Sequence, residues 1–464
     1  MTIIRYPPGP VGLPFVGHLF SYQHDPIGFL MKAVRNYGDI VHFRLGPRNF
    51  FLLNHPDHIE EVLVTHNRNF EKKGQTPPAR QVMGTGLLYS RGNFHLRQRR
   101  LIQPAFHRPR ILAYANIMTK YGMEMQERWQ EGMNLDILEE MTHLTLRIVG
   151  KTLFDKDLES ETGEISETFN LFIKWGLTPG PFYRLLEKLP LPSVHRRQKA
   201  LNQVNTFVHK MINERRISSV DPGDVLSMLL RAQDVEGDGS GMTDRQIRDE
   251  IMTLFITGHE TTALALTWTW YLLSQHPDVE AKLHAEIDTV LADRPPTASD
   301  VEQLPYTQMV FMEAMRLYPP TWRICRRVLG DYRIENYLLP ADSVIMICPY
   351  VTHHDSRYFP DPFKFDPERW LPRPEIRLPR CAYFPFGAGP RQCIGESFAW
   401  MEGILLIATL AQRWRMRLVP NHPVQIMLSV TLRPKQGMQM ILEKRKPPLN
   451  LKLTDFKSNR APVP

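Results

Sequence analysis

The stretch FGAGPRQCIG, residues 386–395, decides the fold that this sequence predicts. Its three glycines and one proline predict a tight turn whose backbone N–H groups point toward the sulfur of Cys393. An apolar helix expected over 394–414 would add the positive end of its dipole there, and Arg391 adds a cation. A lone cysteine is usually a small buried hydrophobe. The surroundings of Cys393 instead favour a thiolate. A single thiolate suits an axial metal ligand better than it suits a zinc site.

A second signal lies inside a long predicted helix, residues 243–275. Thr243 gives its start, Pro277 lies just past its end, and its second half is apolar on all sides, which predicts burial. The helix contains GHETT at 258–262. A glycine costs ~1 kcal/mol in a helix, and a buried carboxylate is costly unless it is used. We therefore expect an opened helical turn with a proton route through Glu260 and Thr261, although a paired glutamate and a back-bonding threonine remain the alternative.

Prolines are spread unevenly along the chain. The sequence has 39 prolines in 464 residues, yet 110–178 has none and 319–390 has twelve. Because proline removes a donor and breaks helices, the middle of the chain can form long helices and 319–390 cannot. The composition, 42% apolar and 23% charged, is that of a globular protein. We expect one large domain, residues 1–464, mainly helical with a small β region.

Local patterns predict shorter elements along the rest of the chain. We expect helices at 26–37 and 55–66, a hairpin at 39–54, several helices over 93–175, another over 196–216, and short strands after 415. Residues 71–92 are rich in glycine and proline and predict a functional loop of about twenty residues. Residues 175–195 form a break rich in proline and bulky apolar groups.

Charge and cysteine content restrict the partners and the compartment. The net charge of +8 permits nucleic acid, an acidic lipid surface or an acidic protein as partner. The basic residues are scattered and no nucleic-acid-binding module is present, so we expect no nucleic acid. Four cysteines without a CxxC pair indicate a reducing, cytoplasmic location. The N-terminus lacks an apolar run of ~20 residues, so we expect neither a signal peptide nor a transmembrane anchor.

Two further motifs carry paired charges. Glu313 and Arg316 are spaced i,i+3 on a helix, and FDPERW at 365–370 offers Arg369 to join them. His95 and Arg99 are spaced i,i+4 and share a helix face. Either motif could simply be part of a solvated charged surface. The functional interpretation of the His95–Arg99 pair is that it binds carboxylates.

Four segments together resemble the cytochrome P-450 family of heme-thiolate monooxygenases. They are the cysteine loop at 386–395, GHETT at 258–262, the 313–316 pair with FDPERW at 365–370, and the basic segment at 95–100. The resemblance runs from the prolines at 7–10 to RPKQG at 433–437. The resemblance implies a mainly α fold with a small β region. In that fold heme b lies between the long central helix and the helix after the cysteine loop. Thiolate ligation of heme is the chemistry known for this family.

The resemblance also implies roles for individual residues. Cys393 would be the thiolate ligand of the heme iron, with Phe386 packed by the sulfur. Glu260 and Thr261 would deliver protons to bound dioxygen, and Thr257, where many members have alanine, would add a water site. The heme propionates would be bound by His95, Arg99, Arg326 and Arg391, with Arg327 competing with Arg326; Glu313, Arg316 and Arg369 would form a structural ion network.

The implied reaction inserts one oxygen atom from dioxygen into a hydrophobic substrate, by hydroxylation or epoxidation. Electrons would come from a separate ferredoxin or flavodoxin-type donor with its reductase, because no Gly-rich dinucleotide motif follows a strand. We expect a monomer. A basic face should attract an acidic carrier; its residues would be Arg97, Arg100, Arg108 and Arg110.

The substrate is expected to be fatty-acid-, terpenoid- or polyketide-like. Its walls should come from apolar and aromatic segments, namely 71–92, 175–195 (a mobile lid), the Thr257 side of the long helix, 321–324 and 430–432. Arg323 would either pair with a carboxylate or face outward. Two other functions stay open: a heme-thiolate enzyme that uses peroxide or rearranges a hydroperoxide, which the Glu260–Thr261 pair argues against, and a non-catalytic heme sensor.

Overall fold

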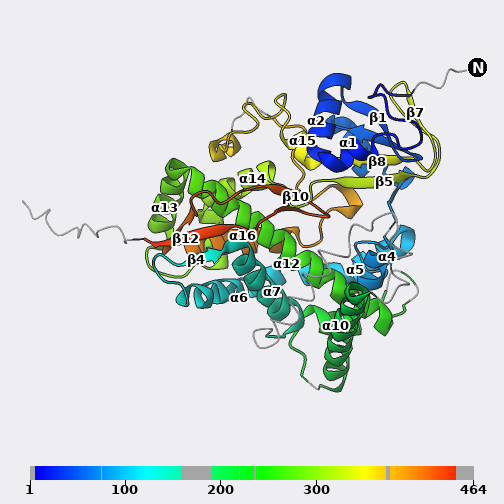
Figure 1. Cartoon of the computed structure of the whole chain (residues 1–464). Coiled ribbons are helices and arrows are strands. Elements are labelled where there is room, and N and C mark those ends of the chain that lie inside the picture. Colours follow the sequence, from blue (N-terminus) through cyan, green and yellow to red (C-terminus); the bar gives the residue numbers. More distant parts are fainter. Residues whose placement is uncertain are drawn as a thin grey trace, which may run out of the picture.

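Helix α12 (Asp244–Gln275) runs through the middle of the molecule, and the other elements are arranged around it (Figure 1). The computed structural model describes residues 6–74, 76–157, 191–218, 220–234, 237, 239–372 and 377–445. As predicted, α12 starts at Thr243, whose side chain forms a capping box with Gln246, and it ends just before Pro277. It packs against α7 (Ile137–Phe154), α10 (Pro192–Ile217), α14 (Pro305–Leu317) and α16 (Glu396–Ala411).

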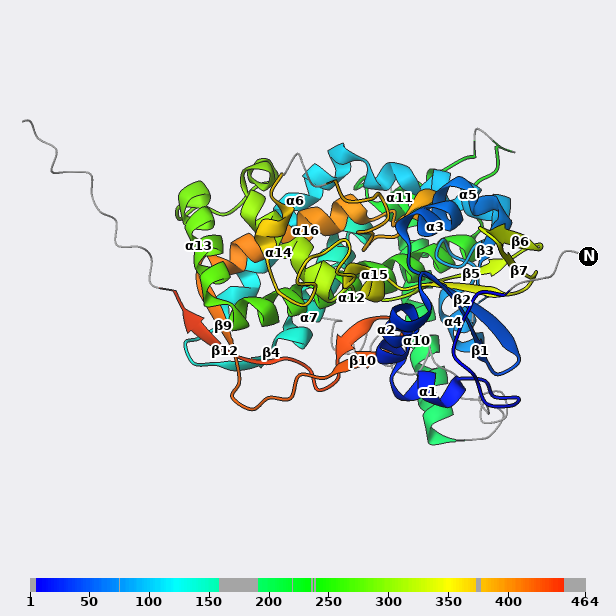
Figure 2. The same cartoon turned by 90° about the horizontal axis from the view of Figure 1, so that it is seen from above.

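The five-stranded sheet and the first helices lie at one end of the molecule, and the sheet formed by β4, β12 and β9 lies toward the other end (Figure 2). A five-stranded sheet has the order β1-β2-β8-β5-β3, in which β2 and β8 are parallel and the other pairs are antiparallel. A three-stranded sheet has the order β4-β12-β9, and two pairs are β6-β7 and β10-β11. The strands are β1 Ile40–Leu45, β2 Arg48–Leu53, β3 Phe70–Lys72, β4 Asn134–Asp136, β5 Ile324–Val328, β6 Tyr332–Ile334, β7 Tyr337–Leu339, β8 Val344–Ile347, β9 Trp414–Leu418, β10 Ile426–Leu428, β11 Leu432–Pro434 and β12 Gln439–Lys444.

The remaining helices and turns surround this frame. They are α1 Leu19–His24, α2 Pro26–Tyr37, α3 Pro56–Glu60, η1 Glu61–Thr65, η2 Asn67–Asn69, α4 Pro77–Met83, α5 Gly92–Ile102, η3 Gln103–Phe106, α6 Arg108–Glu127, α11 Val225–Arg231, α13 Pro277–Leu291, η4 Ala298–Gln303, α15 Pro349–His353, η5 Pro367–Trp370 and η6 Gly389–Arg391. None of the described helices is long and apolar enough to cross a membrane.

Most sequence-predicted elements are confirmed, and one prediction is wrong. Residues 71–92 are not a continuous loop, because α4 occupies 77–83 and β3 ends at Lys72. The reason is local: Thr76 accepts a hydrogen bond from the Ala79 N–H, and Pro77 at the first helical position needs no donor. Residues 175–190 of the predicted 175–195 lid, and residues 158–175 of the predicted 93–175 helices, lie outside the described residues.

The proline-rich stretch is held by a buried ion network. Arg316 donates to both oxygens of Glu313 at 2.7 and 2.8 Å, and Arg369 donates to the same carboxylate at 2.8 Å. Glu313 and Arg316 are fully buried. Arg316 also donates to the backbone carbonyls of His353 and Pro362, which ties the irregular chain to α14. This is the structural ion network that the resemblance implied, and it carries the chain toward the cysteine loop.

Candidate heme-thiolate site

The cysteine loop is shaped by two glycines with left-handed backbone. Gly387 and Gly389 have φ of +74° and +71°, which side chains other than glycine adopt with strain. A Cβ on Gly389 would lie 1.9 Å from the carbonyl oxygen of Leu63, so the loop passes directly against η1. The Cys393 N–H donates to the Phe386 carbonyl at 2.9 Å, which closes the turn. The ring of Phe386 packs on Trp400, with ring centroids 5.6 Å apart.

The thiol of Cys393 is both accessible and desolvated. Its side chain is accessible, yet the surrounding protein desolvates the sulfur and raises the pKa of the thiol to about 11. The Gly395 N–H and Arg99 oppose that rise, whereas Glu396 adds to it. The Gly395 N–H acts in the predicted direction, but Arg99 takes the place of the predicted Arg391, and burial outweighs both, so the heme-free chain does not stabilise a thiolate here. A bound metal cation is needed to displace the proton.

Four sequence-predicted residues come together on the α5 side of the loop. The pKa of His95, which is buried, is lowered to about 4 by desolvation and then by Arg391, Arg99 and Arg326. Burial also lowers the pKa of Arg326 and of Arg391 to about 10, and each residue is affected by other nearby cations. Arg327 is turned away and pairs with Glu71 at 2.8 Å and Asp342 at 2.9 Å, which excludes it as a competitor.

Lys72 belongs to the same cluster and was not predicted. It lies opposite Arg326 in the antiparallel pairing of β3 with β5, and burial, followed by Arg326 and Arg391, lowers the pKa of its ammonium to about 7. Within the described residues, Lys72, Arg326 and Arg391 have no carboxylate at ion-pair distance. Like charges facing across strands are unfavourable unless an anion joins them. The cluster therefore fits a cofactor that carries carboxylates, as heme does.

Two arginines connect this cluster to the cysteine loop and to the segment before α5. Arg99 donates to the Gln392 carbonyl at 2.7 Å, next to the cysteine. Arg391 donates to the Ser90 carbonyl. Arg99 thus contacts the sulfur side of the site as well as His95.

The threonines of α12 differ from the expected opened turn. The hydroxyls of Thr257 and Thr261 donate to the carbonyls four residues earlier, at 2.7 and 2.9 Å, and the helix is continuous through Gly258. Gly258 has a packing reason instead, because a Cβ there would lie 3.2 Å from a methyl group of Val149 on α7. The back-bonding alternative of the sequence analysis therefore describes this helix.

Glu260 is buried and bonded to the C-terminal strands. It accepts a hydrogen bond from the Thr431 hydroxyl at 2.8 Å, and a guanidinium nitrogen of Arg433 lies 3.6 Å away. Burial raises the pKa of this carboxyl, while Arg433 and Thr431 oppose the rise. Its neighbour Thr261 remains half-buried.

Three segments that were predicted to line the substrate meet near Glu260, namely 321–324, 430–432 and the long helix α12. The Leu432 N–H donates to the Pro320 carbonyl at 2.9 Å, and the Trp322 indole donates to the Ser429 carbonyl at 3.0 Å. Trp268 of α12 donates to the Leu432 carbonyl at 3.3 Å. These bonds hold the predicted 321–324 and 430–432 segments, with the flanking Pro320 and Ser429, along one edge of the long helix, and their role as substrate walls stays a prediction.

Residues 84–90 belong to the predicted wall segment 71–92. Two carboxylates of α12 that were not predicted as site residues hold these residues against the helix. Asp249 accepts from the Thr85 N–H at 2.8 Å, and Glu250 accepts from the Leu87 N–H at 2.8 Å and from Gln98 at 2.9 Å. Glu250 is fully buried, and burial raises its pKa to about 7. The only sequence signal was the consecutive acid pair in the first half of the helix, just before its apolar half.

A further carboxyl lies deep in α16. Glu402 is fully buried, and burial raises its pKa well above the ordinary value, opposed by Thr262. It therefore lies between the two helices that flank the site in the implied fold.

The predicted basic face is partly neutralised. Arg97 and Arg100 converge on Asp234, at 3.6 and 2.8 Å, and Arg108 pairs with Glu302 at 3.0 Å. Arg110 is exposed, and no carboxylate of the described ranges is at ion-pair distance from it. It stands at the start of α6, close to Phe106, whose ring lies 3.8 Å from the position of a Cβ on Gly395. The beginning of α6 is therefore close to the side of the cysteine loop that carries the sulfur of Cys393, called the sulfur side below.

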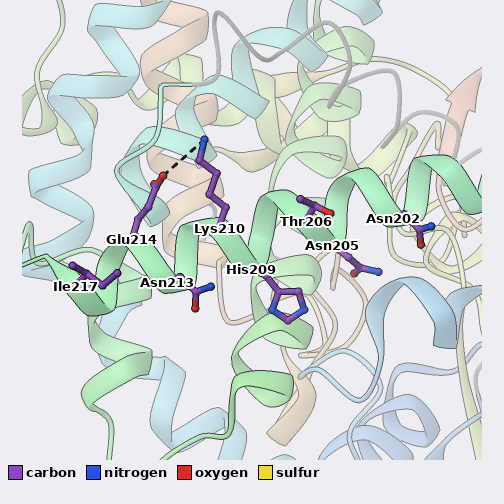
Figure 3. A pocket seen from close by; sticks show the side chains of 8 residues that line it. All are labelled: Asn202, Asn205, Thr206, His209, Lys210, Asn213, Glu214 and Ile217. Atoms are coloured by element: carbon purple, nitrogen blue, oxygen red, sulfur yellow. Dashed lines mark ion pairs between the residues drawn. The ribbon is translucent and has the colours of Figure 1, made fainter.

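A hollow of about 770 Å³ lies elsewhere, along α10 (Figure 3). All of its described lining residues come from that one helix, and two of them, Lys210 and Glu214, form an ion pair at 3.8 Å. No predicted site residue lines it, so it does not compete with the site at Cys393.

Comparisons with known proteins agree with this geometry. The family model described as cytochrome P-450 matches residues 7–442. Among curated proteins, the chain is 40% identical to cyclooctatin synthase of Streptomyces melanosporofaciens, covering 91% of this chain and 92% of the relative. It is 34% identical to pentalenene oxygenase of Streptomyces avermitilis, covering 94% and 97%. Among solved structures, a retinoic acid-bound cyanobacterial protein, CYP120A1, matches with a TM-score of 0.85 at 25% identity, covering 95% of this chain and 100% of that chain.

Proposed function

Because this chain belongs to the cytochrome P-450 family and is a heme-dependent monooxygenase with a cysteine thiolate ligand, we propose that Cys393 is that ligand and that the substrate is a terpenoid. The observation that carries the assignment is the position of the thiol. It is accessible and desolvated, on a loop fixed by Gly387 and Gly389. The cationic cluster around Lys72 and Arg326 lies alongside and would receive the cofactor's carboxylates.

The residues of this chain bind and orient, and they hold protons. When bound, heme supplies the activation of dioxygen, by which one oxygen atom enters the substrate and the other is reduced to water. Cys393 would hold the iron as a thiolate after losing its proton, and the Gly395 N–H and Arg99 favour the negative sulfur. In the heme-free chain burial and its cationic neighbours lower the pKa of His95 to about 4, so it is neutral there and would serve the propionates as a hydrogen-bonding group.

Proton delivery is proposed for Glu260 and Thr261. Burial keeps the Glu260 carboxyl inclined to hold a proton, and Thr431 and Arg433 fix its position. The Thr261 hydroxyl donates to the Thr257 carbonyl and leaves its oxygen able to accept. A rotation of this hydroxyl would let it pass a proton toward the site.

The terpenoid class is supported by the named relatives and by the walls. One relative, 39% identical, is a cyclooctat-9-en-7-ol 5-monooxygenase, and another is pentalenene oxygenase. The 320–324 and 429–432 segments and α12 offer aromatic and aliphatic surface for such a molecule, which suits hydroxylation or epoxidation of an apolar skeleton.

The electron donor is proposed to be a ferredoxin or flavodoxin-type protein with its own reductase. The exposed Arg110 near the sulfur side supports an acidic carrier. The four free cysteines support a cytoplasmic location. The protein is also proposed to be a monomer with a single domain over residues 1–464.

The test of the ligand is the absorption spectrum of the reduced protein with carbon monoxide. A thiolate-ligated heme gives a strongly red-shifted Soret band, and Cys393→Ser should remove the shift. Cys381→Ser, a buried cysteine outside the loop, is the matched control and should keep it. Loss of the shifted band in the control alone would refute the assignment.

The test of proton delivery is Thr261→Ala. We expect oxygenation with the reductase system to become uncoupled while peroxide-driven turnover survives. Equal loss or equal survival of both activities would refute the role of Thr261. Loss of the peroxide-driven activity alone would favour a peroxide-using enzyme.

A further inference from the structure

A second positively charged position, Arg323, lies directly before β5 and outside the cofactor cluster. Arg323 is half-buried, and its guanidinium donates to the Tyr22 hydroxyl at 2.8 Å and stacks on the Trp322 ring at 4.7 Å. It therefore does not face outward. No carboxylate of the described residues lies at ion-pair distance from it, so the structure leaves its charge unneutralised.

Lys73 adds a second cation to the same aromatic cluster, because the ring of Phe50 stacks on Phe43, and Phe43 stacks on Tyr22, the partner of Arg323. Its ammonium lies over the Phe50 ring at 4.7 Å, and it has no carboxylate partner within the described ranges. Burial lowers its pKa, and Arg48 and Arg323 lower it further. Two cations that share one aromatic cluster without a carboxylate are unfavourable unless an anion joins them.

Tyr22 supplies a donor that lacks a good acceptor. It is 7% exposed, and burial raises its pKa to about 12, so the phenol keeps its proton. The oxygen accepts from Arg323, and the proton points to the Met346 sulfur at 4.0 Å, a weak acceptor. An oxygen anion beside Tyr22 would take this proton and a guanidinium N–H together.

The position is continuous with the substrate walls. Arg323 follows Trp322, whose indole is bonded to Ser429 and whose ring lies under the Arg323 guanidinium. An apolar ligand packed on the Trp322 side of this wall would thus bring one end to Arg323.

We propose that Arg323, Lys73 and Tyr22 form a subsite for a carboxylate at one end of an otherwise hydrophobic substrate. The inference rests on the proposed function and specifies it: the substrate is a terpenoid that has already been oxidised to an acid. A reaction that forms a carboxylate on the skeleton would then precede this one.

The experiment compares farnesoic acid, methyl farnesoate and farnesol, which share one skeleton, on the ferric holoenzyme. Dissociation constants come from the spin-state change and, independently, from calorimetry. We expect the acid to bind at least about tenfold more tightly than the ester or the alcohol, as befits charge-assisted hydrogen bonds. Arg323→Leu should remove this preference, Arg323→Lys should keep most of it, and Tyr22→Phe should reduce it.

The matched control is Arg333→Leu, which removes the same charge from an exposed position on β6 and should leave the preference unchanged. Binding of the ester and the alcohol without any gain for the acid would overturn this subsite and leave the proposed function standing. Absence of binding by all three compounds would overturn both. Heme loss in Arg323→Leu as large as in Arg326→Leu would assign the charge to the cofactor and overturn the subsite as well.

Discussion

Lys72 and Arg326 lie directly opposite each other across the antiparallel pair β3 and β5, so a half-buried and a buried cation share one register position. Facing like charges destabilise a sheet by roughly 0.2–1 kcal/mol. We predict that Lys72→Met makes the heme-free chain more stable to urea while it speeds heme loss severalfold. Transfer of heme to excess apomyoglobin measures the second effect. The exposed Arg333→Met is the control, and slower heme loss in Lys72→Met would contradict the assigned role.

The low pKa of His95 predicts an acid-labile interaction in the heme-free chain. The folded pKa, about 4, lies below the ordinary 6.5, so between these values the unfolded chain binds a proton that the folded chain does not. Stability from this residue is therefore lost as pH falls from about 6.5 to about 4, by up to about 3 kcal/mol. His95→Gln should flatten this part of the pH profile of unfolding. Other buried histidines contribute equally to both proteins and cancel.

Glu402 predicts the opposite slope. Its folded pKa is raised by burial, so above pH ~4.5 the unfolded chain releases a proton that the folded chain keeps. Its contribution to stability falls as pH rises. The free energy of unfolding of Glu402→Gln, measured relative to that of the parent, should therefore be higher at pH 8 than at pH 4.5. Parallel pH profiles for the two proteins would show that the carboxyl is ionised in the folded state.

Gly258 tests packing against an opened helix. Its Cβ position lies 3.2 Å from Val149, so Gly258→Ala gains helix propensity of ~1 kcal/mol but crowds α7. We expect Val149→Ala to cost less in the Gly258→Ala background than in the parent, with a coupling of roughly 0.5–3 kcal/mol. Urea unfolding of the four proteins measures it. Additive effects would mean that the two residues do not constrain each other.

Arg110 predicts salt-sensitive electron transfer. Because this cation is exposed near the sulfur side, Arg110→Glu should slow reduction by an acidic ferredoxin at low salt, and added salt should narrow the difference. Arg108→Gln should have a smaller effect, because Arg108 already pairs with Glu302. Reduction that does not depend on salt would exclude an electrostatic carrier site here.

Local signals predicted the parts of this protein that depend on neighbours in sequence. Thr243 and Pro277 gave the limits of α12 to within one or two residues, and the glycine spacing gave the cysteine loop. Lys72 could not be found in this way, because its meaning arises only when β3 pairs with β5, far along the chain. Glu250 was missed for the same reason: its partners Leu87 and Gln98 come from other elements.

The two errors also have physical causes. Helix α4 was missed because glycine and proline nearby outweighed the capping signal of Thr76. The opened turn at Gly258 was wrong because a glycine in a helix can serve a neighbouring helix as well as a kink.

The close passage of Gly389 beneath Leu63 links two segments that lie far apart in the chain. No side chain fits at 389 unless the backbone of η1 moves. Substitutions that reshape residues 61–65 therefore act on the cysteine loop as directly as substitutions within it. For recombination with related sequences, residues 61–65 and 386–395 form one inherited block, and a chimera should take both from the same parent.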